Sequence, residues 1–475
     1  MGAGAEGATV IRPGHIVVRT RPGETFAHVP SHIDCAHGRA RPTCFLDDGP
    51  IDRALRRDTS AFRAARVFHA RGSLHEPGCR HLGFDDLEQE LGLARTYRVE
   101  LADDDPTVTR DTVRRLRDLL SVESATVQTL ATAPLLIDDR PPSVEVHHPA
   151  PKEVDEPHEV VHAAAALELE PGDAEVVVAV VDTGVSLDHP EFRGRLMAGY
   201  DTVDLGIGRV GEDMRLVGDS WGRDHAPDDG TGHGSHVAGI IGAKGLRVRP
   251  GLAGRCLVLP LRVLAAAMTS GSEQQKVIGV GSIADIDAGL KLAIDAGAAV
   301  VNMSLGTEGT DLDPHAEEPH GAIARYAEAL GVVLVAAAGN SGRKQAVYPA
   351  VLPAVIAVGA MEVDGRRSDF STYGDHLALC APGRGVISVG RRRYRRSTGT
   401  SHAAPFVAAT AALLITHARR RGVTLSARQV RELLEGSADR LGRGGDRDIE
   451  VGAGMLNAAG ALRRLDEQLE RGRAA

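Results

Sequence analysis

Residues 399–405 carry the residue type best suited to nucleophilic chemistry, a serine in a turn of small residues. An apolar run at 406–415 follows and predicts a buried helix that begins near Ser401. Pro405 fits the first turn of such a helix, because N–H groups there have no partner within the helix. A hydroxyl at this position faces free N–H donors and the positive end of the helix dipole, which suits a nucleophile whose attack creates an oxyanion. Taken alone, the pattern is more typical of a helix cap.

A serine hydroxyl is a weak nucleophile until a base takes its proton, and that base must be held in place. The chain offers Asp182 in Val-Val-Asp-Thr-Gly-Val and His233 in Gly-Thr-Gly-His-Gly-Ser-His-Val-Ala-Gly. The resulting order of Asp, His and Ser is that of subtilisin. With these three motifs in this order, the chain resembles the subtilases, a family of subtilisin-like serine proteases, over roughly residues 160–465.

The resemblance implies a role for each chemical residue. Ser401 would attack the peptide carbonyl, His233 would take its proton and later protonate the leaving amine, and Asp182 would hold the imidazole in its productive tautomer. His233 is preferred to His236 because the family uses the first histidine of this motif. Asn340 matches the family's oxyanion-hole asparagine, which would act together with the backbone N–H of Ser401.

The resemblance also implies two groups of substrate-binding residues. One is an edge strand to which a peptide would add through main-chain hydrogen bonds. The other is the wall and base of an S1 pocket, whose base residue predicts an apolar P1 side chain. The residues of the two groups are Ser304, Leu305, Gly306, Ala338, Gly339 and Val347.

His402 replaces the methionine that usually follows the nucleophile in this family. Histidine has no thioether that peroxide can oxidise, so we expect activity to survive mild peroxide treatment. The imidazole is also expected to titrate near neutral pH and to add a second acid limb to the rate profile.

No metal site is predicted. The loop that binds calcium in many subtilases is absent, since residues 242–254 are short and basic. A different insertion at 201–229, rich in Asp and Gly, is either a weak calcium loop or a solvated loop, and the solvated loop is preferred. Five residues near the N-terminus have the types of zinc ligands but not the spacing of a closed site, so free thiols and solvated histidines are preferred: His28, His32, Cys35, His37 and Cys44.

Five regions are expected along the chain. Residues 1–60 are read as an irregular extension, and 61–132 as a small α/β unit that resembles the subtilase prodomain with one strand missing. The Pro-rich residues 133–158 are expected to be an extended, exposed linker that is open to cleavage. The catalytic domain is placed at 159–465, and a C-terminal tail at 466–475.

Within the catalytic region, short apolar runs alternate with helical patterns. Continuous runs are typical of parallel strands buried on both faces, and Asp182 stands at the C-terminal end of one, where open α/β sheets place their ligands. The sequence therefore predicts an α/β fold, a doubly wound and largely parallel sheet with helices on both faces. The predicted strands are residues 176–181, 256–264, 298–303, 332–338, 354–358 and 377–380.

Composition limits the partners and the location. The net charge of −9 over 475 residues argues against nucleic acid as the main partner. The sequence contains no run of about 18 apolar residues, so no membrane span is predicted. The N-terminus shows no signal peptide, and five cysteines suit a reducing compartment. We therefore expect a cytoplasmic protein, with secretion as the alternative.

The expected function is peptide-bond hydrolysis by a serine endopeptidase through an acyl-enzyme, with no required cofactor. A protease dedicated to maturing one peptide or protein fits the missing signal. The expected partners are a peptide or protein substrate and the chain's own N-terminal region, which would act as an inhibitor and folding chaperone. The alternative is a protein that binds peptides without cleaving them. Labelling of Ser401 by a fluorophosphonate probe would distinguish this alternative from a serine endopeptidase.

Overall fold

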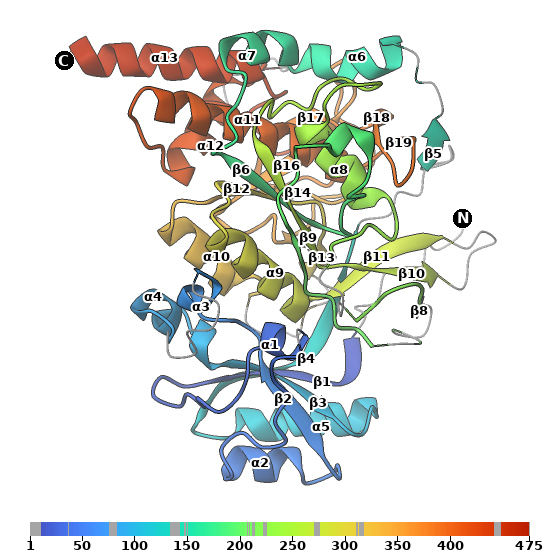
Figure 1. Ribbon diagram of the computed structural model, residues 1–475, viewed down its shortest axis with the longest axis vertical. Coiled ribbons are helices and arrows are strands. Elements are labelled where there is room, and N and C mark those ends of the chain that lie inside the picture. The colour runs from blue at the N-terminus through green and yellow to red at the C-terminus, as the bar shows by residue number, and fades with distance from the viewer. Residues whose placement is uncertain are drawn as a thin grey trace.

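The apolar runs of the catalytic region form a seven-stranded parallel sheet in the order β17-β16-β14-β12-β6-β9-β7 (Figure 1). Both faces of these strands are covered, which explains their continuous apolar sequences. The computed structural model thus confirms the predicted α/β class. The strands are β6 (Val177–Asp182), β7 (Tyr200–Asp201), β9 (Leu257–Arg262), β12 (Val300–Met303), β14 (Val333–Ala337), β16 (Val355–Met361) and β17 (Leu377–Pro382). The structure describes residues 11–474 apart from 37, 76–82, 134–142, 147–148, 150, 207, 209, 211–213, 222–225, 270–275, 310–311, 313–317 and 441–447.

Helices cover the sheet on both faces. On one face, α8 (His233–Gly242) and α11 (Thr400–Arg420) pack into a large apolar core, which α7 (Ala163–Leu169), α12 (Ala427–Ser437) and α13 (Ala458–Ala474) enlarge. On the other face lie α9 (Ile283–Asp295) and α10 (Gly321–Ala329). Among the described residues, no helix is both long and apolar enough to cross a bilayer.

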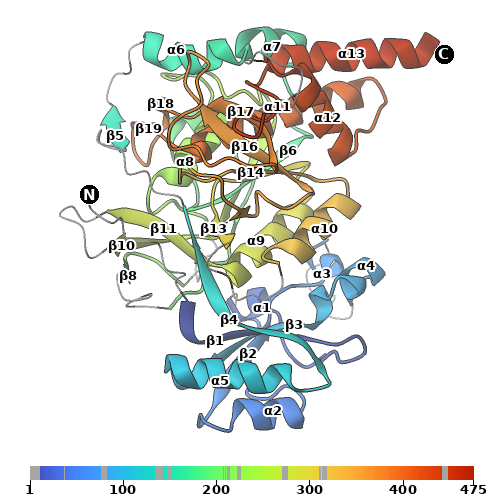
Figure 2. The ribbon, with the colours of Figure 1, turned by 180° about the vertical axis from the view of Figure 1, so that it is seen from behind.

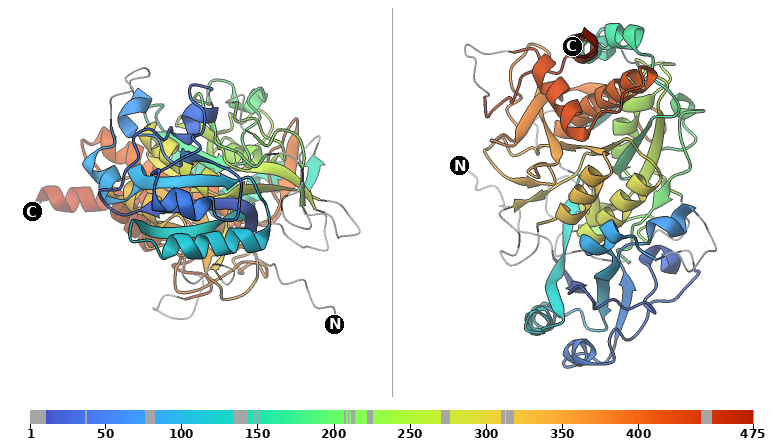
Figure 3. Two further views of the ribbon diagram at one scale, coloured as in Figure 1. Left: turned by 90° about the horizontal axis from the view of Figure 1, so that it is seen from below. Right: turned by 90° about the vertical axis from the view of Figure 1, so that its left-hand side faces the viewer.

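The N-terminal unit is an antiparallel sheet in the order β2-β3-β1-β4, drawn below the catalytic unit in Figure 1 and seen from two further sides in Figure 3. Its strands are β1 (Ile11–Thr20), β2 (Phe62–Arg66), β3 (Thr96–Leu101) and β4 (Val122–Thr132), and α2 (Pro50–Leu55) and α5 (Pro106–Arg117) contribute to its core. The smaller elements of this unit are α1 (His32–Ala36), α3 (Arg71–His75), α4 (Asp86–Glu90) and the 3-10 helix η1 (Leu93–Arg95).

The prediction of an irregular region at 1–60 is wrong, because β1 lies there and supplies the missing strand between β3 and β4. β1 contains Pro13 and Gly14, which are both unfavourable in the interior of a strand. The register with β4 shifts between Arg12 and Ile16, which accommodates both residues, and beyond the shift Ile16 and Val18 alternate inward.

β4 joins the two units. Its last residues pair with β11 (Val277–Ser282) of the catalytic unit, so that one sheet continues as β4-β11-β10-β8. β10 is Ala265–Thr269 and β8 is Met214–Leu216. In Figure 2, β4 rises from the N-terminal sheet to the side of β11.

Two further boundary predictions are wrong. Within the expected extended linker, β5 (Ser143–Val146) pairs with β19 (Tyr394–Ser397), and α6 (Pro151–Val160) is helical although it contains Pro157. Val154 and His158 of α6 are buried on the catalytic unit, and this packing offsets the cost of the proline. The expected tail from residue 466 is part of α13, whose Leu465 is buried. The remaining elements are η2 (Pro190–Phe192), β13 (Thr307–Glu308), β15 (Val347–Tyr348) and β18 (Val386–Val389).

Candidate active site

Asp182 and His233 are brought together at the carboxyl end of β6. Asp182 is fully buried, and its Oδ1 accepts hydrogen bonds from the N–H of Thr183 at 2.7 Å and from Nδ1 of His233 at 2.7 Å. His233 begins α8, and the next residue is Gly234, where a Cβ would clash with the carbonyl of Gly184. The carboxylate therefore fixes the imidazole with Nδ1 protonated and Nε2 as the acceptor.

Ser401 lies in the first turn of α11, as predicted, and is almost fully buried. Its Oγ donates to the carbonyl of Ser304 at 3.3 Å, and Oγ of Ser304 donates to the carbonyl of Ser401 at 2.8 Å. Nε2 of His233 is buried and has no hydrogen-bond partner among the described residues. The base and the nucleophile are thus not hydrogen-bonded in this structure, and such bonds often tighten only when substrate binds.

Asn340 lies shortly after β14, and hydrogen bonds from Thr400 to its amide oxygen hold the side chain in place. Oδ1 accepts from the backbone N–H and from Oγ1 of Thr400, both at 2.9 Å. This assignment leaves Nδ2 buried with no partner among the described residues. A donor that is oriented but unused, next to the residue that precedes Ser401, is what an oxyanion hole requires.

The residues predicted for the S1 pocket come together around Val347. A Cβ added to Gly306 would lie 2.7 Å from its Cγ1, and one added to Gly339 would lie 2.9 Å from its Cγ2. Ala338, Gly339 and Leu305 are buried beside them. The two glycines therefore leave room for the side chain of Val347 between the two walls.

The predicted substrate edge is occupied by the chain itself. Thr132, the last residue of β4, exchanges two backbone hydrogen bonds with Gly306, at 3.1 and 3.3 Å. On its other side, Thr132 is paired with Val280 of β11, and the N–H of Ala133 donates to Gly279 at 3.0 Å. β11 is thus a second wall of the cleft. Sequence reasoning missed it, although its closely spaced glycines were a signal that another backbone approaches.

Comparison with known proteins identifies the family and the fold of this chain. The model of the subtilase family matches residues 173–454. The chain belongs to the subtilase family. A curated relative, thermitase of Thermoactinomyces vulgaris, is 34% identical over 268 residues, which are 56% of this chain and 81% of thermitase. The thermophilic serine proteinase of Bacillus sp. strain AK1 is 35% identical over 56% of this chain, and the alignment spans only 56% of that protein.

A solved structure, the prenylagaramide maturation protease PagA, is similar to this subtilase with a TM-score of 0.50 and 28% identity. The match covers 64% of this chain and 98% of PagA. Together with the relatives, it makes the protein a subtilisin-like serine protease, a hydrolase that acts on peptide or protein substrates.

Asp229 is a residue of the site that sequence reasoning missed. It was assigned to the loop at 201–229 as a solvated or calcium-binding residue, but it is buried. Its carboxylate accepts five close hydrogen bonds from Oγ1 of Thr183, the N–H groups of Thr231, Gly232 and Ser235, and Oγ of Ser235. In this subtilase, Asp229 therefore fastens the turn before His233 to the end of β6.

Two other carboxylates of that loop also bind a protein group. Asp201 lies 2.5 Å and Asp219 lies 2.7 Å from Nη1 of Arg262. Within the described residues, no cluster of His, Cys, Asp and Glu has the arrangement of a metal site. These carboxylates neutralise a buried arginine, so the solvated-loop prediction is wrong for Asp201.

The two other histidines near Ser401 are neutral. Nε2 of His236 contacts the carbonyls of Val386 and Arg395 at 3.0 and 3.1 Å, and burial lowers its pKa to about 3. The ring of His402 lies 4.4 Å from that of His236 and 5.5 Å from that of His233. Burial first, and then these histidines and Arg395, hold the pKa of His402 well below its usual value. The expectation that His402 titrates near neutral pH is therefore wrong.

The variant His402→Met tests the chemical role of this position. We expect wild-type activity to survive mild peroxide and the variant to lose most of its activity, because the new thioether would be oxidised beside the nucleophile. The pH profile of kcat/KM should show the same acid limb in both enzymes, since the buried imidazole stays neutral over that range. Rapid loss of activity in peroxide-treated wild type would contradict the first expectation.

Proposed function

We propose that the protein cleaves internal peptide bonds through an acyl-enzyme formed on Ser401. His233 acts as the base and then as the acid, Asp182 orients it, and Nδ2 of Asn340 with the N–H of Ser401 stabilises the oxyanion. The observation that carries the proposal is the 2.7 Å bond between Asp182 and His233, which leaves an acceptor nitrogen buried and unused. The experiment is labelling by a fluorophosphonate probe: labelling of Ser401 supports the proposal, and its absence from folded protein supports a non-catalytic peptide-binding protein.

A peptide substrate would bind as an extended strand between β11 and the segment from Ser304 to Gly306. The pairing that Thr132 and Ala133 already make there supports this mode of binding. The similarity to PagA, named a maturation protease, supports the narrower proposal that this protein matures one class of peptide or protein.

We further propose that the N-terminal unit inhibits the enzyme and is cut by it. In the antiparallel pairing, Gly306 faces Thr132. Continued by two residues, this register would bring residue 134 opposite Ser304, whose carbonyl contacts Oγ of Ser401. The bond after Pro134 is therefore the one we expect Ser401 to attack. Residues 134–142 lie outside the described part of the chain.

Intact mass and N-terminal sequencing of the purified chain test this cleavage. We expect wild-type protein to yield fragments 1–134 and 135–475, and Ser401→Ala protein to remain whole, because the tethered segment is held at a high effective concentration. Cleavage of both proteins at the same bond would show that another protease makes the cut, and a cut elsewhere would contradict the proposed register.

Two groups of charges, one fully buried and one partly exposed, support stable docking of the N-terminal unit. In the first, Nζ of Lys291 lies 2.5 Å from Glu88 of the N-terminal unit and 2.6 Å from Asp295, and all three side chains are fully buried. In the second, Arg98 of β3 contacts Asp285 at 2.8 Å and Asp204 at 3.2 Å. Removing one partner from such a buried group leaves an uncompensated charge, so these pairs fix the orientation in which β4 enters the cleft.

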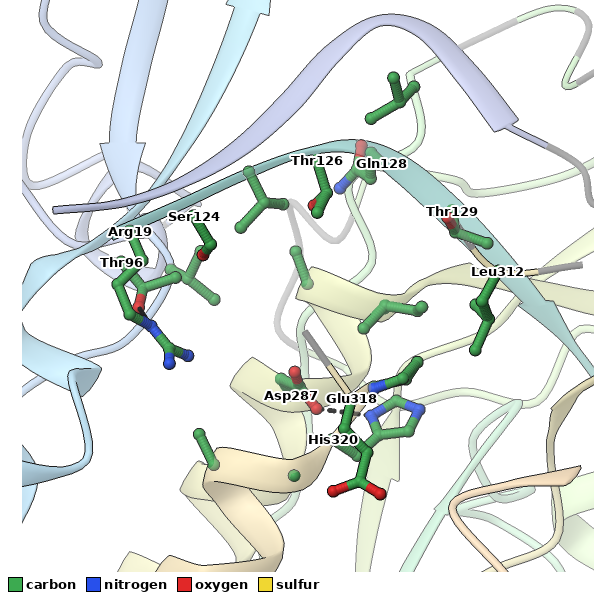
Figure 4. A pocket seen from close by; sticks show the side chains of 18 of the residues that line it. Arg19, Thr96, Ser124, Thr126, Gln128, Thr129, Asp287, Leu312, Glu318 and His320 are labelled. Atoms are coloured by element: carbon green, nitrogen blue, oxygen red, sulfur yellow. Dashed lines mark hydrogen bonds and ion pairs between the residues drawn. The ribbon is translucent and has the colours of Figure 1, made fainter. Parts of the chain in front are cut away.

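A cavity of about 110 Å³ lies between β4 and the first turns of α9 and α10 (Figure 4). Thr126 and Gln128 of β4 line it on one side, and Asp287 and His320, joined by a 2.6 Å hydrogen bond, line it on the other. The cavity belongs to the interface between the units and contains none of the proposed catalytic residues. Docking also includes apolar contact, because Val67, Phe68 and Leu93 of the N-terminal unit belong to the same buried cluster as α9 and α10.

A further inference from the structure

One leucine of the N-terminal unit is inserted into an apolar cluster that otherwise belongs to the catalytic unit. Leu130 of β4 is 4% exposed. The rest of the cluster comes from the chain before His233, which includes β8, and from β10 and β11. We call these residues the Leu130 pocket: Val203, Leu205, Val210, Met214, Leu216, Ala265, Ala267, Ile278 and Val280.

The strand register fixes the position of Leu130 in the cleft. Leu130 pairs with Ser282, and Thr132 pairs with Val280 and Gly306. Successive side chains on a strand point to opposite faces, so Leu130 is on the face opposite to Ala131 and Ala133. Those two alanines are buried in a different cluster, the one that contains Leu305. The cleft therefore has two apolar surfaces, of which one receives methyl groups and the other receives a whole leucine side chain.

The walls of the Leu130 pocket are fastened by groups of the catalytic unit. Oγ1 of Thr202 donates to the carbonyl of Asp285 at 2.7 Å, and the N–H of Asp204 donates to its carboxylate at 3.2 Å. The N–H of Leu205 donates to Ser220 at 2.9 Å, and that of Val217 donates to Ala266 at 2.9 Å. These four contacts hold the pocket walls without β4, and Arg12 of β1 adds hydrogen bonds to the carbonyls of Asp204 and Leu205, both at 2.9 Å. An apolar pocket with fixed walls is typical of a ligand site.

We propose that the Leu130 pocket is a substrate subsite that selects a large aliphatic side chain four residues before the residue whose carbonyl is attacked. This inference rests on the proposed protease function and on the register proposed for self-cleavage. A substrate peptide that pairs with β11 and Gly306 as β4 does would present its side chain to the same residues. Leu130 would then be the part of the N-terminal unit that imitates the substrate.

The test compares the full-length chain with Leu130→Asp and a matched control. Leu120 belongs to the same unit but is 90% exposed and outside the pocket, so Leu120→Asp introduces the same charge elsewhere. We expect the fluorophosphonate probe to label Ser401 at least about tenfold faster in Leu130→Asp than in wild type, because a buried carboxylate would expel the segment from the cleft. Leu120→Asp should label at the wild-type rate. If Leu130→Asp prevents folding, Leu130→Ala serves for the same comparison.

A second measurement tests which side chain the Leu130 pocket binds once Leu130 has been removed from it. Two blocked hexapeptides, Gln-Thr-Leu-Ala-Thr-Ala and Gln-Thr-Ala-Ala-Thr-Ala, are used to protect Ser401 of the Leu130→Asp chain from the probe. We expect the leucine peptide to protect at roughly tenfold lower concentration, the scale of discrimination by an apolar pocket. The added change Leu216→Ala should reduce this ratio.

The possible results distinguish failure of the subsite proposal from failure of the protease proposal. Equal labelling of wild type and Leu130→Asp, or equal protection by the two peptides while Ser401 is labelled, would overturn the subsite and leave the protease proposal intact. Failure of the probe to label Ser401 in any folded chain would overturn the protease proposal, and the subsite with it.

Discussion

Replacing Ser401 or His233 by alanine is expected to lower kcat by about 10⁶, and the double variant should lose little more. The magnitude is taken from subtilisin, where nucleophile and base act as a unit. The geometry here supports the same behaviour, because a 2.7 Å hydrogen bond to Asp182 fixes His233, and Oγ of Ser401 contacts the carbonyl of Ser304 and no ionisable group among the described residues. Without either residue, only binding and oxyanion stabilisation remain.

The measurement is the turnover of a peptide substrate by each variant. Ser401→Ala also blocks the expected self-cleavage, so every protein, including wild type, carries a site for an unrelated protease within residues 135–142 and is cut there before assay. If the logarithmic losses in kcat of the two single variants added up in the double variant, the assignment of Ser401 and His233 to one triad would be contradicted.

Replacing Asn340 is expected to lower kcat by about 10²–10³ with little change in KM, because its Nδ2 would bind the oxyanion more strongly than the substrate carbonyl. That nitrogen is buried without a partner among the described residues. This magnitude is also the one known for subtilisin. Asn340→Ala removes both the donor and the acceptor for Thr400.

The variant Asn340→Asp separates those two roles. Aspartate keeps an oxygen for the N–H and hydroxyl of Thr400 but offers no donor to the oxyanion. We expect Asn340→Asp to be at least as slow as Asn340→Ala, whereas Ser341→Ala, a neighbour whose side chain contacts Thr372 instead, should stay within a few-fold of wild type. Recovery of activity in Asn340→Asp would mean that the residue acts only by holding α11.

The proposed catalytic residues could be identified from the sequence because they lie in short local motifs. Asp182 ends a continuous apolar run, His233 and Ser401 begin helices, and these features are decided within a few residues by steric and hydrogen-bonding rules. The parallel sheet was predictable for the same reason, since alternating apolar runs and helices allow few arrangements. In the structure, β6 ends at Asp182 and β14 ends at Ala337, three residues before Asn340.

Local rules misplaced the N-terminal boundaries. β1 was not predicted, and it forms although it contains Pro13 and Gly14, because its neighbours β3 and β4 bury its alternate side chains. Proline likewise argued against α6, where burial of Val154 against the catalytic unit prevails over the lost hydrogen bond. In both places, tertiary contacts outweigh the local propensity on which sequence reasoning depends.

The family, the parallel sheet and the types of the proposed catalytic residues could be predicted from local motifs. Their surroundings could not: Asp229 is buried and holds the turn before His233, His402 is kept neutral by burial, and β4 fills the cleft. The physical reason is distance along the chain. Thr132 and Gly306 are paired by a register that no local pattern encodes, and the burial of a side chain depends on all the segments that fold over it.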